Sequence, residues 1–210
     1  MNKVEADKEL LKKLILEFGR TEVESSKHVW RRIIENPFNN ILLGAFNIRR
    51  LGGKGDDYAF RTFYDIKFRT TKSRISTIAE FIEKRINEGK LKDLVDELGF
   101  TSELEETLKK LINLNKKYNL DERTNLCDID ADEFYEDLKR IKGFGFEEGT
   151  ILPWVVCDLM RWWNLRAPKE LKLSKNSREM LEKLGLSPDD FDVKNYPYVD
   201  SAMFVLSKDC

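Results

Sequence analysis

Histidine and cysteine are scarce in this sequence, and their scarcity excludes several kinds of chemistry. The 210 residues include one histidine, His28, and three widely spaced cysteines, Cys127, Cys157 and Cys210. A single histidine argues against His-based zinc sites and against Ser-His-Asp or Cys-His catalysis. Three separated cysteines form neither a disulfide framework nor a CxxC zinc site. We therefore expect no metal and no cofactor, and any chemistry must depend on carboxylates, lysines or hydroxyl groups.

The sequence also lacks long apolar runs. None approaches the ~20 residues of a membrane span, and the N-terminal residues MNKVEADKELLKK lack the apolar core and cleavage site of a signal peptide. These absences predict a soluble, cytoplasmic protein with no membrane partner. The length is enough for one large domain or two small interlocked ones, and we treat residues 1–210 as a single unit.

Apolar residues recur at helical spacing along most of the chain, and no alternating apolar and polar stretch competes as a strand. This pattern predicts an all-α fold of about ten short helices. Residues 10–18 and 29–34 mark the first two, and residues 38–48 mark a third that is apolar all round and so is expected at the centre of the core. The other helices are expected near 57–68, 73–88, 90–98, 102–118, 131–141, 147–163, 174–185 and 197–207.

The net charge of −1 hides an uneven distribution of charged residues along the chain. Residues 47–75 carry eight bases against three acids, a net of +5, and residues 159–183 carry seven against three, a net of +4. Residues 93–148 carry sixteen acids against eight bases, a net of −8. This segregation favours one phosphate-binding face and an acidic back, although ordinary solvated helix faces would give a similar pattern.

The most informative segment is LKRIKGFGFEEGTILPWVVCDL, which starts at Leu138. It has the form of two short helices joined by a tight hairpin. Gly143 and Gly145 would allow positive φ and close approach of a ligand to the backbone, while Phe144 would tuck between the helices. Backbone amides at the start of the second helix would then face a phosphate oxygen. Glycine at the end of a helix is also common without any ligand, so the hairpin alone does not establish binding.

In order of parts, the chain resembles the helix-hairpin-helix DNA glycosylase superfamily. Leu138, Ile141 and residues 143–145 match the family hairpin, residues 173–178 occupy the segment that follows it, and residues 183–186 match its end. The resemblance implies two interlocked helical subdomains, 36–125 and 1–35 plus 126–210. It also implies a protein that binds double-stranded DNA and hydrolyses the N-glycosidic bond of a damaged or modified base. We expect a monomer. The DNA contacts would come from Lys142, Gly143, Phe144, Gly145, Lys175, Asn176 and Arg178.

Two departures from the family pattern bear on catalysis. The family lyase lysine corresponds to Glu147, which cannot form a Schiff base, so a monofunctional enzyme is favoured. The family aspartate corresponds to Ser174, whose hydroxyl brings no negative charge and is otherwise a natural helix N-cap. Asp158, in an apolar stretch, and Glu147 are the alternative catalytic carboxylates. Asp158 would otherwise form an ion pair with a neighbouring arginine, and Glu147 would be an ordinary acid of a first helical turn.

Trp154, Trp162 and Trp163 are candidates for the wall of a pocket that holds a flipped base, although core packing would explain them equally. Adjacent residues cannot share one helix face, so one of Trp162 and Trp163 is expected to face a pocket or the surface. Two other functions remain open. In the first, the chain is a catalytically inactive module that holds DNA or RNA. In the second, it is an all-α protein-interaction domain in which the glycines only connect helices.

Overall fold

The computed structural model describes residues 3–145 and 151–208, and every regular element in these ranges is a helix. This confirms the predicted all-α class. In chain order the α-helices are α1 (Lys3–Ile34), α2 (Pro37–Asn47), α3 (Asp56–Lys72), α4 (Ile78–Asn87), α5 (Leu91–Glu97), α6 (Glu103–Tyr118), α7 (Ala131–Lys139), α8 (Ile151–Trp163), α9 (Lys175–Lys183) and α10 (Tyr196–Lys208). Three short 3-10 helices accompany them, η1 (Arg49–Leu51), η3 (Pro188–Asp190) and η4 (Val193–Asn195).

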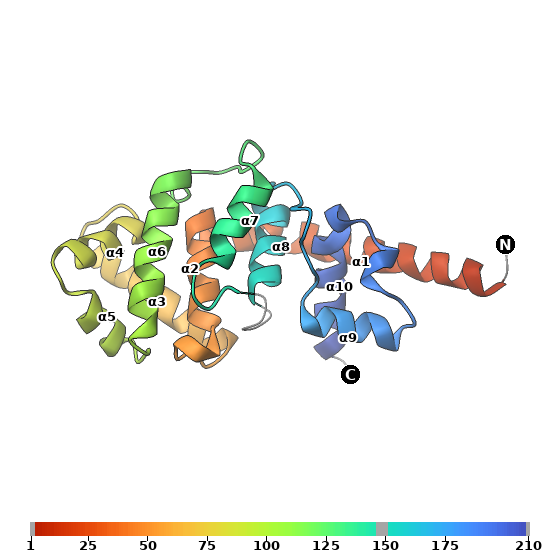
Figure 1. Cartoon of the computed structure of the whole chain (residues 1–210), viewed down its shortest axis with the longest axis horizontal. Helices are drawn as coiled ribbons and strands as arrows, with labels where there is room; N and C mark the ends of the chain where they lie inside the picture. The colour runs from red at the N-terminus through yellow and green to blue at the C-terminus, as the bar shows by residue number, and fades with distance from the viewer. Residues whose placement is uncertain (1–2, 146–150, 209–210) are drawn as a thin grey trace.

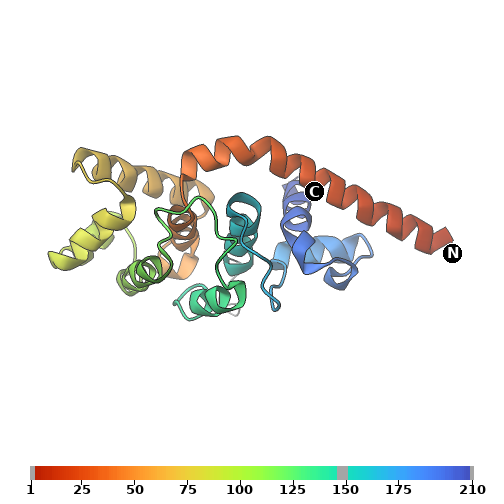
Figure 2. The same cartoon turned by 90° about the horizontal axis from the view of Figure 1, so that it is seen from above.

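Helix α1 is one continuous helix of 32 residues, where the sequence predicted two helices. The polar residues between its apolar stretches do not break it, because the hydroxyls of Thr21 and Ser26 donate to the carbonyls of Glu17 and Glu22 within the helix. Gly19 serves packing: an added Cβ would lie 2.0 Å from the carbonyl oxygen of Tyr198 in α10. Figure 2 shows α1 along one side of the molecule, with its N-terminal part extending beyond the other helices.

Helix α2 is the centre of the core, as its sequence predicted. All of its residues from Pro37 to Phe46 are buried, and it packs against α1, α3, α6 and α8. The Asn36 side chain caps its start by accepting a hydrogen bond from the backbone N–H of Asn39. Because α8 lies against this buried helix, the second half of the hairpin segment is anchored in the core.

The remaining helices fall on either side of this centre (Figure 1). Helices α3 to α6 lie at one end of the elongated molecule, α9 and α10 lie towards the other, and α7 and α8 lie between them. Predicted helix 73–88 begins only at Ile78, because Arg74 takes a left-handed conformation (φ 55) and Thr77 caps the new helix. No helix in the described part of the chain is long and apolar enough to cross a membrane.

Candidate nucleic-acid interface

The predicted hairpin begins with a well-defined helix and turn. The Asp130 carboxylate accepts hydrogen bonds from the backbone N–H groups of Asp132 and Glu133, which caps the start of α7. After α7 the chain turns through two short backbone hydrogen bonds, from Ile141 N–H to the Leu138 carbonyl and from Phe144 N–H to the Ile141 carbonyl, each 3.0 Å. Helix α8 follows. The candidate residue Glu147 lies outside the described residues.

Gly143 is required by the turn for two independent reasons. Its φ of +93 is rarely adopted by other residues, and an added Cβ would lie 2.9 Å from Ile48 Cδ1. Phe144 is fully buried, as the sequence predicted. Gly145 differs, since its φ is not in the left-handed region, and among the described residues the nearest atom to an added Cβ is the Lys139 carbonyl oxygen at 4.0 Å. The described surroundings of Gly145 therefore do not demand glycine.

A small charged cluster ties this turn to η1. Glu103, at the start of α6, accepts hydrogen bonds from Lys142 Nζ at 3.0 Å and from Arg50 Nε at 3.1 Å. These two hydrogen bonds lower the pKa of the Glu103 carboxyl. The Thr107 hydroxyl also donates to the Lys142 carbonyl at 3.2 Å. Two cations thus share one carboxylate, and the cluster keeps a net positive charge.

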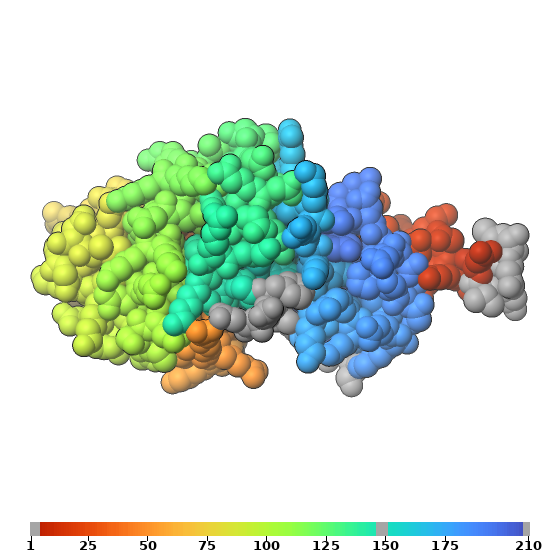
Figure 3. Space-filling view, in the orientation of Figure 1, coloured from red at the N-terminus to blue at the C-terminus, as the bar shows by residue number. Residues whose placement is uncertain are grey.

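The turn, η1 and the start of α9 lie along one long edge of the molecule (Figure 1), also seen in the space-filling view (Figure 3). We call this the hairpin edge and define it by Arg49, Arg50, Lys54, residues 142–145, Lys175 and Asn176. Arg49, Arg50, Lys54, Lys175 and Asn176 are exposed, whereas Lys142 is half-buried. The edge therefore offers five cationic side chains beside a glycine-containing turn.

The two basic segments of the sequence, residues 47–75 and 159–183, do not present all of their basic side chains on one surface. Arg161, counted in the second segment, has a side chain that is only 6% exposed, so it does not offer its charge to a phosphate. In the first segment Lys67 pairs with Glu35 and Arg69 pairs with Asp65 and Glu97. The expectation of one basic face built from these two segments is therefore reduced to the smaller hairpin edge.

Directly beneath the start of α9 lies a buried set of charged and hydroxyl groups. We call Asp158 and Arg161 of α8, Ser174 and Ser177 at the start of α9, and Asp200 of α10 the inner polar cluster. Asp200 Oδ1 accepts from the Ser177 hydroxyl at 2.8 Å and from the Ser174 hydroxyl at 3.2 Å, while Asp200 Oδ2 accepts from Arg161 at 3.1 Å. The Asp200 carboxylate thus accepts hydrogen bonds from three side chains inside the protein, where the residue is only 4% exposed.

Asp158 has a much poorer environment than Asp200, although it also neighbours Arg161. Its Oδ1 lies 3.1 Å from Arg161 Nε, but that N–H is not aligned for a hydrogen bond. Oδ1 accepts a 3.2 Å hydrogen bond from Trp162 Nε1, and no described residue donates to Oδ2. Burial raises the pKa of Asp158 to about 7, against the opposing effect of Arg161. The expected ion-pair role of Asp158 is thus present, and its catalytic role stays a prediction.

The other candidate residues divide between the surface and the core. Ser174 is the N-cap of α9, accepting from Ser177 N–H, and is 9% exposed. Arg178 and Trp154 are half-buried. Trp162 is 5% exposed and Trp163 0%, so the expectation that one of the pair faces a pocket or the surface is wrong. Helices α1, α2, α7 and α10 all pack against α8 and cover both of its sides.

Sequence reasoning missed Asp200, although the signal was available. Asp200 lies in the stretch Val199–Met203, next to apolar residues on α10, in the same kind of context that singled out Asp158. What the pattern did not contain was the partner, because Ser174 and Asp200 come from different helices. Cys157 is buried beside this cluster, and burial raises the pKa of its thiol well above the usual value, so it stays protonated.

Neither comparison with known proteins nor the arrangement of possible metal ligands assigns a function to the chain. No protein-family model, curated protein or solved structure matched the chain. Among residues 3–145 and 151–208, no group of three or more His, Cys, Asp or Glu side chains is arranged to hold a metal ion. The hairpin edge and the inner polar cluster are therefore the candidate functional features of the described residues.

Proposed function

We propose that this protein binds duplex DNA through the hairpin edge, as a divergent relative of the helix-hairpin-helix DNA glycosylases. The observation that carries the proposal is the turn at Gly143. Its left-handed backbone is held against Ile48 beside η1, and it is followed by a helix anchored in the core. A glycine turn after a helix, with cationic side chains on the same edge, suits the contact of backbone amides with phosphate oxygens.

Binding of this kind depends on charge and on close approach rather than on base sequence. Exposed Arg49, Lys54 and Lys175 would neutralise phosphates on either side of the turn. Gly145 has no side chain and would allow a phosphate to come close to the backbone, and none of the described residues around it requires glycine there. We expect affinity for duplex DNA that falls steeply as the salt concentration rises.

The test is fluorescence anisotropy with a labelled duplex at several salt concentrations. The double variant Lys142→Gln, Lys175→Gln should bind more weakly, and its plot of log affinity against log salt should be less steep by about two. A matched control, Lys13→Gln with Lys92→Gln, removes the same charge from exposed positions on α1 and α5. Equal affinities for all three proteins would contradict the proposal and favour a protein-interaction domain.

A second candidate function, release of a damaged base, is favoured by one specific observation. Asp200 lies 3.2 Å from Ser174, the position to which the resemblance assigns the family aspartate. In glycosidic hydrolysis water adds to the sugar C1′ while the base leaves with a proton, and a nearby carboxylate stabilises the positive charge that develops on the sugar. Asp200 would supply that charge from α10. Because both residues are buried, the start of α9 would have to move to admit the sugar.

Base release is tested on duplexes that carry oxidised, deaminated or alkylated bases. Alkali-labile sites without prior strand cleavage would indicate monofunctional excision, and Asp200→Asn should abolish them while the folded variant keeps its affinity for the duplex. If no lesion is released by a protein that binds these duplexes, the function is binding without excision.

A further inference from the structure

Helix α3 presents two aromatic side chains to solvent on neighbouring turns. Phe68 is 66% exposed and Tyr64 is 48% exposed, and Phe68 is the most exposed large apolar side chain of the described residues. The opposite side of the helix is buried through Ala59, Phe63 and Ile66. Single exposed apolar residues are ordinary on protein surfaces. Two rings one helical turn apart, about 6 Å along the axis, form instead a small continuous aromatic patch.

These rings share one side of α3 with polar and charged side chains. We call this side the α3 face and define it by six exposed residues that are spaced three or four apart, Asp57, Arg61, Tyr64, Phe68, Thr71 and Lys72. Arg61 precedes the two rings and Lys72 follows them, and the two cations are about 16 Å apart along the axis. Figure 2 shows α3, coloured between orange and yellow, on the same side of the molecule as α1. The α3 face therefore carries an aromatic pair with one cation at each end.

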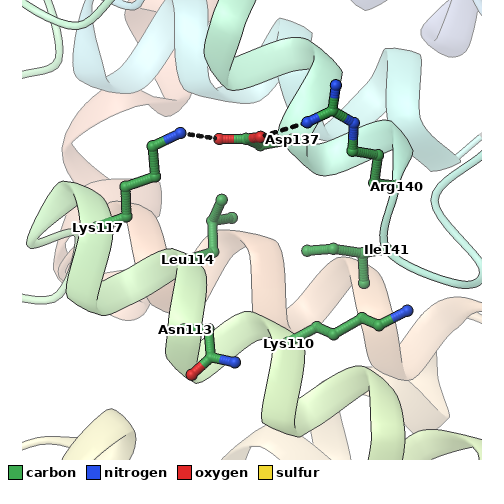
Figure 4. A pocket seen from close by; sticks show the side chains of 7 residues that line it. All are labelled: Lys110, Asn113, Leu114, Lys117, Asp137, Arg140 and Ile141. Carbon is green, nitrogen blue, oxygen red and sulfur yellow. Dashed lines mark hydrogen bonds and ion pairs between the residues drawn. The ribbon is translucent and has the colours of Figure 1, made fainter.

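The two cations of the α3 face have no carboxylate partner in the described part of the chain. Elsewhere on the surface, basic side chains are held by acids, as Lys117 and Arg140 are held by Asp137 (Figure 4). Arg61 and Lys72 form no such ion pair with any described residue, and both are exposed. Because no carboxylate has to be displaced, both charges are available to the phosphates of a ligand.

Aromatic rings between cations match the chemistry of a single nucleic-acid strand. Exposed rings stack on base faces, which a single strand offers and a base-paired duplex keeps inside its own stack, while cations neutralise the phosphates on either side. A membrane surface is a poorer match, because an interfacial helix needs a broad apolar face. Four of the six residues of the α3 face are instead polar or charged. The arrangement therefore favours a single strand over a lipid surface.

We propose that the α3 face binds single-stranded nucleic acid. Two neighbouring bases stack on Tyr64 and Phe68, and Arg61 and Lys72 hold the phosphates before and after them. The Tyr64 ring is supported by an edge contact with the buried ring of Phe63, whose centroid lies 5.9 Å away. The strand is DNA or RNA, since both present stacking bases and phosphates. The site is independent of the proposed function, because it uses none of the residues of the hairpin edge.

The test is fluorescence anisotropy of the full-length chain with short labelled strands of oligothymidine and oligouridine. Tyr64→Ala and Phe68→Ala should each weaken strand binding about 10-fold, the loss expected for one stacked base. Phe68→Trp keeps a ring and should bind as tightly as the wild type. Phe68→Leu keeps an apolar side chain without a ring and should bind as weakly as Phe68→Ala. Phe18→Ala is the matched control, because Phe18 is also exposed, at 39%, but lies on α1.

The phosphate contacts are tested by the salt dependence of strand binding. The double variant Arg61→Gln, Lys72→Gln should bind the strand more weakly. Its plot of log affinity against log salt should be less steep by about 1.4, or about 0.7 for each phosphate contact that is lost. The matched control, Lys13→Gln with Lys92→Gln, removes the same charge from exposed positions on α1 and α5 and should keep the wild-type slope. All of these side chains are exposed, so thermal unfolding should be unchanged in every variant.

Three results would overturn the proposal. They are an unchanged strand affinity in Tyr64→Ala and Phe68→Ala, an equal loss in Phe18→Ala, and wild-type affinity in Phe68→Leu. Vesicles of phosphatidylcholine and phosphatidylserine that bind the wild type but not Phe68→Ala, with no strand binding by either protein, would also overturn it and identify a membrane surface. If the proposal holds, the tighter of the two strands identifies DNA or RNA as the partner. Phe68→Ala should leave duplex binding unchanged, so this result and that for the hairpin edge can fail separately.

Discussion

Ser174 Oγ lies 3.2 Å from Asp200 Oδ1, so a carboxylate from α10 meets the N-cap residue of α9 inside the protein. The same carboxylate pairs with Arg161, whose side chain is 6% exposed. Arg161 joins α8 to α10, and the two serines join α10 to α9. The inner polar cluster therefore fixes the position of three helices at once, whatever chemistry it also performs.

Replacement of Asp200 by Ala should destabilise the fold strongly. Arg161 would keep a buried contact with Asp158 that is not aligned for a hydrogen bond, and the hydroxyls of Ser174 and Ser177 would lose their carboxylate acceptor. Removal of one partner of a buried ion pair costs about 3–5 kcal/mol. The free energy of unfolding in urea at pH 7 measures this loss. Asp192→Ala is the control, because Asp192 pairs with Lys194 on the surface and its loss should change the stability far less than the loss of Asp200.

Asp158 should make the stability depend on pH in an unusual direction. Its pKa is about 7 in the folded protein and ~3.9 in the unfolded chain. Between these values the folded state holds more protons, so the stabilising contribution is complete below about pH 4 and is lost as the pH rises to about 7. Each unit of pKa difference is worth about 1.4 kcal/mol. Chemical unfolding at pH 5 and pH 8 measures the effect.

The variant Asp158→Asn isolates this contribution, because it keeps the shape of the side chain and cannot ionise. The difference in unfolding free energy between the wild type and Asp158→Asn should change between pH 5 and pH 8, with the wild type losing more stability. Groups with a lowered pKa, such as Asp137, contribute equally to both proteins and cancel. Parallel curves for the two proteins would contradict the assignment.

The two hairpin glycines should respond differently to alanine. Gly143→Ala places a Cβ 2.9 Å from Ile48 in a left-handed conformation, which alone costs about 1–2 kcal/mol, so thermal unfolding should occur at a lower temperature. In Gly145→Ala the added methyl group comes no closer than 4.0 Å to any described residue, so the unfolding temperature should be unchanged. If the hairpin edge binds DNA, Gly145→Ala should nevertheless weaken duplex binding, because its methyl group occupies the space that a phosphate would approach.

Much of the fold could be predicted from the spacing of apolar residues. The entirely buried stretch from Pro37 to Phe46 was recognisable because nearly all of its residues are apolar. The continuous α1 was not, since the packing of Gly19 against Tyr198 depends on a helix almost 180 residues later in the chain.

The site could be predicted only where it depends on residues that lie close together in the sequence. The turn at Gly143 follows from a short motif, and its left-handed φ agrees with that reading. The pairing of Ser174 with Asp200, and the burial of both Trp162 and Trp163, arise from the way α8, α9 and α10 meet. Such contacts between distant segments leave no periodic pattern in one sequence.

Removal of the acid that joins Arg50 and Lys142 should strengthen DNA binding. Glu103 neutralises part of the charge of both cations, so Glu103→Gln would release that charge to phosphates, and we expect a several-fold higher affinity for duplex DNA at low salt with a steeper salt dependence. The pairs are partly exposed, so stability should change little. Anisotropy titrations across a salt series measure the change, with Glu106→Gln, which removes the partner of Lys110 on the same helix, as the control. An unchanged or weaker affinity in Glu103→Gln would show that Arg50 and Lys142 do not face the DNA.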